Sequence, residues 1–320
     1  MSAYPLLFLL LLAPSPSVVP EDVKQAAELY QHGHFRKAAD LLSSLSQSSP
    51  DDAEIRVWLG KSLLKLQKWD DAVREIEVAV RLQPANATYY LWLGRACGHR
   101  ASHSQFLTAL GWAKKVAKAF EKAQELAPDN LDVRFDLMDF YLNAPGIVGG
   151  GRDKSEAEAA AIEKLDPSKG YLARASLLEK DKNWDQARIV LSEAVSRYPE
   201  KADCLVDLAD FLLRRQQFEA AAATAQKALS LDANSATAKL ILAEAQIRLG
   251  KCISDAESAL TSLSKSPLDY DDPTFEAVYY WLGEALLAEG KTQEAREAFR
   301  TSLRYNPDFE KTKNALSRMR

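Results

Sequence analysis

The sequence predicts an all-α fold in which about eight helix-turn-helix units stack into a solenoid. One observation is a close internal repeat, because "WLGKSLLKLQKWDDAVREIEVAVRLQP" at residues 58–84 aligns with "WLGEALLAEGKTQEAREAFRTSLRYNP" at residues 281–307. Another is the spacing of prolines, since Pro50 and Pro84 lie 34 residues apart. This period is typical of units with two antiparallel helices, and one unit cannot bury its own apolar face without a neighbour.

Small residues recur at two places in the units, where the first helix is expected to cross the second. Small side chains let the two helix axes approach closely, and aromatic residues fill the space beside them. The small residues of the first helices are Ala26, Gly60, Gly94, Ala175, Ala209, Ala243 and Gly283. Those of the second helices are Ala38, Ala72, Ala187, Ala221 and Ala295. The aromatic residues are Phe35, Trp69, Trp184 and Phe218.

This pattern resembles the tetratricopeptide-repeat (TPR) family over nearly all of residues 22–309. The resemblance implies a right-handed α-solenoid within residues 19–309. We expect units at residues 19–52, 53–86, 87–130, 131–167, 168–201, 202–235, 236–275 and 276–309. Residues 310–320, "EKTKNALSRMR", predict a C-terminal capping helix, since a terminal repeat needs a polar outer face.

Three stretches depart from the period, and we expect insertions near residues 99–115, 143–153 and 267–275. The middle stretch contains "APGIVGGG", which is similar to the APG-x-x-GGG loop of a subgroup of exported bacterial TPR proteins. That similarity implies no agreed activity. Export, which this subgroup shares, does agree with the apolar run at the N-terminal end of the sequence.

The first 17 residues predict a signal peptide. The run "LLFLLLLA" at residues 6–13 has the length of a signal-peptide apolar region, and the small residues of "PSPS" follow it. We therefore expect an exported protein, periplasmic or secreted, or a cytoplasmic one if this segment is not a functional signal. The run is shorter than the roughly 20 apolar residues that span a bilayer, so we expect no membrane span after cleavage.

Composition and cysteine usage narrow the classes of function. The chain has 320 residues, 47% of them hydrophobic, and a net charge of −4. This charge argues against a nucleic-acid partner, because phosphate binding needs a basic surface. Cys97, Cys204 and Cys252 are scattered and odd in number, which predicts small buried hydrophobes rather than a disulfide framework.

The stretch "NAPGIVGGGRDKS" at residues 143–155 raises the question of a phosphate-binding loop. Arg152 and Asp153 stand where a P-loop requires Lys and Ser or Thr, and the loop follows a predicted helix rather than a strand. We interpret it as a structural detour between two helices, with Asp153 or Ser155 as the cap of the second. An anion bound by Arg152 and Lys154 stays open as an alternative.

No pattern of catalytic or metal-binding residues emerges. His32 and His34 occupy the turn "QHGHF", and His99 and His103 are four residues apart, but no third ligand accompanies either pair. No Ser/His/Asp or Cys/His arrangement is apparent. We predict a protein that is not an enzyme and that uses no cofactor or metal.

The family's groove positions supply the candidate binding residues. Carried over to this chain, the resemblance implies a partner-binding groove of Lys61, Leu91, Arg95, Phe135, Asp139, Asn143, Asp210, Glu244, Tyr280 and Glu284. Charge along this set changes from basic to acidic, beside an apolar strip. The acidic end is explained by ordinary i,i+4 pairs, Asp210 with Arg214 and Glu244 with Arg248. We expect Lys61 and Arg95 to be exposed and to orient an acidic segment of the partner.

The sequence therefore predicts a non-catalytic scaffold that binds a peptide or helix of a partner protein in its concave groove. One alternative is a small-molecule or anion-binding protein that uses the groove beside the Gly-rich loop 146–151. Another is an accessory subunit of an envelope enzyme complex. The sequence identifies no particular partner and no oligomeric state.

The signal-peptide prediction is tested by N-terminal sequencing of the native protein. The mature chain should begin near Val18, because small Ser15 and Ser17 flank the expected cleavage site. Intact Met1 in the cytosolic fraction would contradict export.

Overall fold

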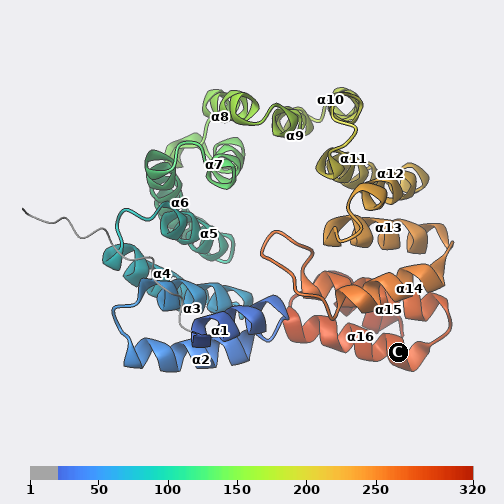
Figure 1. Ribbon diagram of the computed structural model, residues 1–320, viewed down its shortest axis with the longest axis horizontal. Coiled ribbons are helices and arrows are strands. Elements are labelled where there is room, and N and C mark those ends of the chain that lie inside the picture. The colour runs from blue at the N-terminus through green and yellow to red at the C-terminus, as the bar shows by residue number, and fades with distance from the viewer. Residues whose placement is uncertain (1–20, 320) are drawn as a thin grey trace, which may run out of the picture.

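The computed structural model describes residues 21–319, and this part of the chain is all-α, with seventeen α-helices, one 3-10 helix and no strand. Sixteen of the helices form antiparallel pairs that stack side by side, and the last helix follows the final pair. Figure 1 shows the pairs succeeding one another around a ring. The predicted α-solenoid of TPR-like units is therefore confirmed.

The first four pairs contain the two longest helices of the described residues and the 3-10 turn. Their elements are α1 Glu21–Gln31, α2 Phe35–Ser48, α3 Ala53–Lys65, α4 Trp69–Leu82, α5 Ala87–Ser102, α6 Phe106–Leu126, α7 Leu131–Asn143, η1 Gly146–Val148 and α8 Arg152–Leu165. The last four pairs and the final helix are more regular. They are α9 Pro167–Lys180, α10 Trp184–Arg197, α11 Ala202–Arg214, α12 Phe218–Leu231, α13 Ala236–Leu249, α14 Ile253–Leu263, α15 Phe275–Ala288, α16 Thr292–Tyr305 and α17 Glu310–Arg318.

Polar residues after the closing prolines start several of the first helices. The Asp52 carboxylate accepts hydrogen bonds from the Glu54 and Ile55 amides at 2.9 and 3.2 Å. The Asn130 side chain accepts one from the Val133 amide at 3.1 Å. These side chains satisfy amides that have no partner within the helix.

Small residues mark the contact between the two helices of a pair, as the sequence predicts. A Cβ atom added to Gly60, Gly94 or Gly283 would lie closer than 3.0 Å to Ile76, Phe120 or Phe299 respectively. The equivalent Ala175 and Ala209 are fully buried. A larger side chain at these positions would force the paired helices apart.

The two ends of the solenoid meet and close the ring. Figure 1 shows α1 and α2 beside α15 and α16. The Gln67 amide Nε2 donates to the Asn306 side-chain oxygen at 2.9 Å, and the Leu268 N–H donates to the Gln31 carbonyl at 2.8 Å. Buried residues from both ends form one continuous core, which the sequence period did not predict.

Aromatic rings form the centre of this closure. The Phe35 ring of α2 lies edge-on to Phe275 and Tyr305, with centroids 6.2 and 6.0 Å away. Phe275 and Tyr305 stack at 5.1 Å. The two pairs that cross the closure, Phe35 with Phe275 and Phe35 with Tyr305, contribute about 0.5–1.5 kcal/mol each beyond the area they bury.

The final helix packs against the last pair. Thr312 of α17 is buried, and its hydroxyl lies 2.8 Å from the Ser302 hydroxyl of α16. Arg296 donates to the Met319 carbonyl at 3.0 Å. The helix thus covers part of α16 that would otherwise face solvent.

The predicted signal peptide at residues 1–17 lies outside the described residues. Within residues 21–319, no helix is both long enough and apolar enough to cross a membrane.

Closure is tested by adding one methyl group at Gly33. Its φ is +75°, and an added Cβ would lie 2.9 Å from the Tyr305 hydroxyl and 3.0 Å from the Phe275 ring. Gly33→Ala should cost about 1–2 kcal/mol for the left-handed backbone, plus about 1–3 kcal/mol for crowding the closure. Urea unfolding monitored by circular dichroism measures the sum.

Gly290→Ala is the matched control. Gly290 occupies the equivalent turn of the last pair with φ +77°, but an added Cβ meets nothing within 4 Å. In Gly290→Ala the free energy of unfolding should fall by the backbone cost alone. Equal losses in the two variants would show that the ends do not press together at Gly33.

Candidate binding site on the inner side of the ring

The first helices of the pairs form the inner side of the ring. Successive first helices, such as α3 with α5 and α11 with α13, pack against each other directly. In Figure 1, α5 and α7 accordingly lie nearer the middle than α6 and α8. Residues on these first helices are therefore the ones that a bound partner would meet on the concave side.

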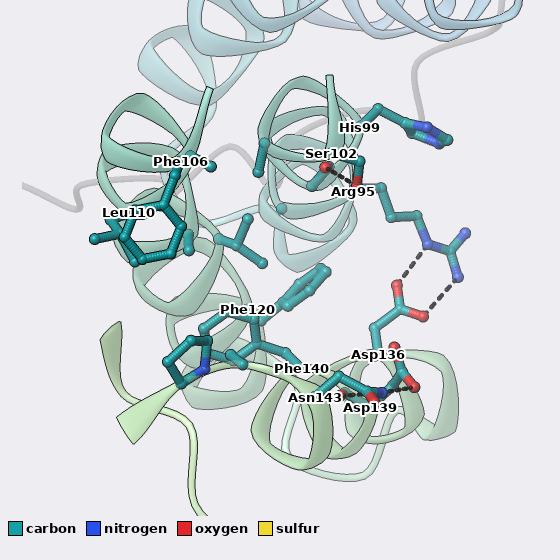
Figure 2. A pocket seen from close by; sticks show the side chains of 18 of the residues that line it. Arg95, His99, Ser102, Phe106, Leu110, Phe120, Asp136, Asp139, Phe140 and Asn143 are labelled. Carbon is teal, nitrogen blue, oxygen red and sulfur yellow. Dashed lines mark hydrogen bonds and ion pairs between the residues drawn. The ribbon is translucent and has the colours of Figure 1, made fainter. Parts of the chain in front are cut away.

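A pocket of about 620 Å³ opens between α5, α6 and α7. Its volume is within the range of about 300–1,000 Å³ that is usual for ligand sites. Apolar side chains form one side, and Figure 2 shows the largest of these, Phe106, Leu110, Phe120 and Phe140. Polar side chains form the other, namely Arg95, His99, Asp136, Asp139 and Asn143.

The pocket exists because the third pair is longer than the others. Helix α6 has 21 residues, whereas the second helices of most pairs have 14. Its added N-terminal turns extend beyond the crossing with α5, where Gly98 offers no side chain to fill the space. Phe106 is consequently 72% exposed and Leu107 81% exposed. The insertion near residues 99–115 thus supplies one wall of the pocket.

Arg95 is the central charge at the mouth of the pocket. Its Nε lies 2.6 Å from an Asp136 carboxylate oxygen, and its side chain is only 10% exposed. Burial opposes the charge of Arg95, but the bond to Asp136 outweighs it and raises the pKa of the guanidinium. Burial raises the pKa of Asp136, and Arg95 opposes that rise. The pair therefore depends on both partners being present.

Lys61 is enclosed by aromatic rings. Its ammonium lies 3.6 Å from the Trp58 ring centroid, 4.5 Å from Trp92 and 5.4 Å from Tyr30. Burial lowers the pKa of Lys61 to about 8, while the ring faces attract its charged form. The expectation that Lys61 and Arg95 are exposed is wrong, because neighbouring helices and aromatic rings cover both.

Three of the predicted groove residues come together at this pocket. Arg95, Asp139 and Asn143 all line it, and the Asn143 amide donates to Asp139 at 2.7 Å. Burial raises the pKa of Asp139, and this hydrogen bond opposes the rise. Phe135 packs instead with Met138 and Ile162 in a separate core cluster.

Two apolar residues of the predicted groove are buried, and Phe135 is half-buried. Leu91 is 4% exposed and Tyr280 6% exposed, because both pack into the core. Leu91 and Tyr280 therefore hold helices together here, and they are not available to a partner.

The acidic end of the predicted groove is paired with arginines. Asp210 lies 2.8 Å from Arg214, Glu244 lies 3.9 Å from Arg248, and Glu284 lies 3.4 Å from Arg318. The first two are the i,i+4 pairs that the sequence predicts. Arg214 also bonds to Glu179 of the preceding first helix.

The Gly-rich loop folds back onto its own unit. The amides of Gly149, Gly150 and Gly151 donate to the carbonyls of Gly146, Pro145 and Tyr141. A Cβ at Gly150 would overlap the Ala144 carbonyl, so the close approach requires glycine there. Helix α8 starts after Gly151 with no side-chain cap.

The predicted cap at Asp153 or Ser155 is therefore wrong. Ser155 is buried, and its hydroxyl instead donates to the Met138 carbonyl of α7 at 3.1 Å. Arg152 bonds to Glu156 and Asp181, and Lys154 bonds to the Gly149 carbonyl. An anion at Arg152 and Lys154 stays a prediction, and it would have to compete with these internal partners.

The histidines and cysteines have structural surroundings. His99 and His103 stack on the Trp69 ring at 5.3 and 4.7 Å, and burial and Lys65 lower the pKa of His99. Cys97 and Cys204 are buried as predicted, whereas Cys252 is exposed at the start of α14. The prediction of a buried residue is wrong for Cys252.

Sequence reasoning missed two groups that reach the inner side. One is Asp136, whose partner Arg95 lies a full unit away. The other is the linker between α14 and α15, which brings Tyr270 to the mouth of the pocket. The aspartate-rich "LDYDD" at residues 268–272, within an expected insertion, was the one available signal.

Sequence comparison finds the same repeat in this chain. Two models, both described as tetratricopeptide repeat, match it, one at residues 29–94 and 178–244 and the other at residues 276–309. Together these matches cover just over half of the 320 residues. No curated protein sequence matches the chain.

Solved structures show a similar fold. Yeast Tom70 is similar with a TM-score of 0.64 and 18% identity, over 96% of this chain and 65% of the length of that one. A thermophilic TPR protein of Thermus thermophilus has a TM-score of 0.49 and 22% identity, over 60% of this chain and 97% of that one. At such identities the likeness concerns the fold alone.

The Arg95–Asp136 pair should be strongly coupled. Arg95→Ala should lower the free energy of unfolding by about 3 kcal/mol, because it leaves the Asp136 carboxylate poorly solvated without its partner. Asp136→Asn in the same chain should recover part of that loss. A double-mutant cycle by urea unfolding should give a coupling energy of about 1–3 kcal/mol.

The exposed pair of Arg300 with Glu297 on α16 is the control, with side chains 58% and 63% exposed. Its coupling should stay below about 0.5 kcal/mol. If both cycles give the same small value, solvent screens Arg95 and the enclosed geometry at the pocket mouth is wrong.

Proposed function

Since the chain belongs to the tetratricopeptide-repeat family, we propose that it is a non-catalytic scaffold that binds a segment of a partner protein on its concave side. The observation that carries this proposal is the pocket between α5, α6 and α7, with its apolar wall and its polar mouth. No partner's identity follows from the fold, because function resides in the site and many functions share this architecture.

The pocket suits an apolar or aromatic anchor side chain. Burying one such side chain contributes about 1.5–3 kcal/mol, which corresponds to roughly a tenfold to hundredfold gain in affinity. Exposed Phe106 and Leu107 at the start of α6 extend the apolar surface beyond the pocket. A partner segment could therefore place one side chain inside and lay its neighbours along α6.

The polar groups at the mouth of the pocket favour ligand binding over catalysis. Arg95 is bonded to Asp136, and Asp139 is bonded to Asn143, which also accepts from Lys180 at 2.7 Å. Acid–base catalysis requires a group that can exchange its proton with a substrate. Groups that are held by one another can instead present fixed hydrogen-bonding edges to a peptide backbone.

A second candidate ligand is an apolar small molecule. The pocket's volume and its mainly apolar lining support it, and Ala144 and Pro145, directly before the Gly-rich loop, form part of the wall. We also propose that the protein acts outside the cytoplasm, on the basis of the apolar run at residues 6–13.

Filling the pocket tests the proposal. Gly98→Leu places a side chain into the pocket, where an added Cβ meets nothing within 4 Å. Helix stability should rise by about 1 kcal/mol, because leucine is the better helix former. Partner capture by the tagged full-length protein from its own cells, quantified by mass spectrometry, should fall at least tenfold.

Gly111→Leu is the matched control, since Gly111 also lies within a helix and has open space around it but does not line the pocket. Capture by this variant should equal that of the unmodified chain. If a protein partner is retained equally by all three chains, the partner binds elsewhere. If only a co-purifying small molecule disappears with Gly98→Leu, the second candidate is correct.

A further inference from the structure

The linker between α14 and α15 lies on the inner side of the ring. It comprises residues 264–274, whereas an ordinary linker between units, such as residues 232–235, is much shorter. Figure 1 shows it extending from the last units towards α5. None of its residues belongs to a helix or strand. It crosses the surface where the predicted basic end of the groove is located.

The backbone of this segment is fixed to the first unit. The Leu268 N–H donates to the Gln31 carbonyl at the end of α1, at 2.8 Å. The Gln31 side chain donates to Asp269 at 2.9 Å, and Leu268 itself is buried. The segment is thus held by main-chain and side-chain contacts from a helix more than 200 residues away in sequence.

Tyr270 makes the most extensive contacts. Its ring stands edge-on to Trp92 at 4.7 Å, and the Arg95 guanidinium lies 4.7 Å from the ring centroid. The Lys65 ammonium lies 5.0 Å from the same centroid. The Tyr270 hydroxyl is 3.1 Å from His99 Nε2. One tyrosine therefore meets aromatic and basic residues of α3 and α5 together.

The neighbouring aspartate adds charge complementarity. Asp271 lies 3.8 Å from Arg95, and its side chain remains 72% exposed. Asp271 thus meets Arg95, while Tyr270 beside it meets both Arg95 and Lys65, which stand on adjacent first helices. These are the contacts by which a separate peptide would be recognised, through aromatic anchoring and complementary charge.

We propose that this surface binds an extended partner segment in which tyrosine is flanked by acidic residues, and that residues 268–272 occupy it as an internal competitor. This inference rests on the proposed function and specifies the partner's chemistry. Tyr270 also lines the pocket between α5, α6 and α7, so a partner that displaces it gains access to both surfaces.

The tethered segment should compete strongly. A short linker gives its own segment an effective concentration on the order of millimolar, so a free peptide of equal intrinsic affinity binds poorly to the intact chain. Below that concentration, only a partner with further contacts, such as an anchor in the pocket, displaces the segment. The internal segment therefore raises the threshold for binding and restricts it to partners that use both surfaces.

The probe is a fluorescein-labelled peptide of residues 266–273, Ser-Pro-Leu-Asp-Tyr-Asp-Asp-Pro. The host is the full chain carrying Asp269→Ser, Tyr270→Ser and Asp271→Ser, which keeps buried Leu268 and both prolines. Fluorescence anisotropy should show binding at least tenfold tighter than to the unmodified chain, and weaker at high salt. In this host, Lys65→Gln should weaken binding about two- to fivefold, whereas Lys118→Gln on the outer helix α6 should not.

Two results would overturn the inference: equal peptide binding by the two chains, or equal binding of a peptide with alanine in place of tyrosine. If the substituted chain does not fold, hydrogen exchange on the unmodified chain decides, since peptide supplied well above the effective concentration of the internal segment should accelerate exchange of the Leu268 amide. No acceleration would refute displacement. Neither assay uses a cellular partner, so their results are independent of the capture experiment. A cellular partner whose capture is lost with Gly98→Leu but unchanged by the substitutions at residues 269–271 would refute this inference and leave the proposed function intact.

Discussion

Phe35 of the first unit packs edge-on against Phe275 and Tyr305 of the last, and this contact constrains the rest of the structure. An open solenoid leaves an uncovered apolar face at each end, which terminal repeats normally shield with polar surface. Here the two ends shield each other and share one core. Closure also brings the linker before α15 to α1, so a segment near residue 270 completes a surface built near residue 60.

The closed ring also determines what lies beside the irregular third pair. Regular pairs are held by glycine or alanine at the crossing, as at Gly60 against Ile76, and leave little space between helices. The third pair keeps this crossing at Gly94 but extends α6 beyond it, and Gly98 leaves the added length unfilled. A pocket therefore opens beside the place where Tyr270 arrives. The pocket thus results from local departures, whereas the regular units repeat the same close packing.

Local periodicity determines which parts of the fold and of the site were predictable from the sequence. The repeat, the helix pairs and the small residues at the crossings follow from spacing alone, because each unit contacts its neighbours in the same way. The i,i+4 pairs at Asp210 and Glu244 are likewise local. The closure was not predictable, since it depends on small rotations between units that accumulate over the whole chain. For the same reason Asp271, at the opposite end of the chain, could not be inferred as a partner of Arg95. Asp136 lies in the adjacent unit, but the repeat spacing does not show which side chains pair across that contact, so Arg95 was expected to be exposed.

The closed ring is tested most directly by a distance between its ends. Lys37 of α2 and Arg304 of α16 line one shared cavity, so spin labels at these two positions report on closure. Cys252 is exposed and should be replaced by serine, whereas Cys97 and Cys204 are buried. Pulsed dipolar spectroscopy on the full chain should give one short, narrow distance distribution. A long and broad distribution would show that the solenoid is open, that the ends do not shield each other, and that residues 268–272 do not reach the inner surface.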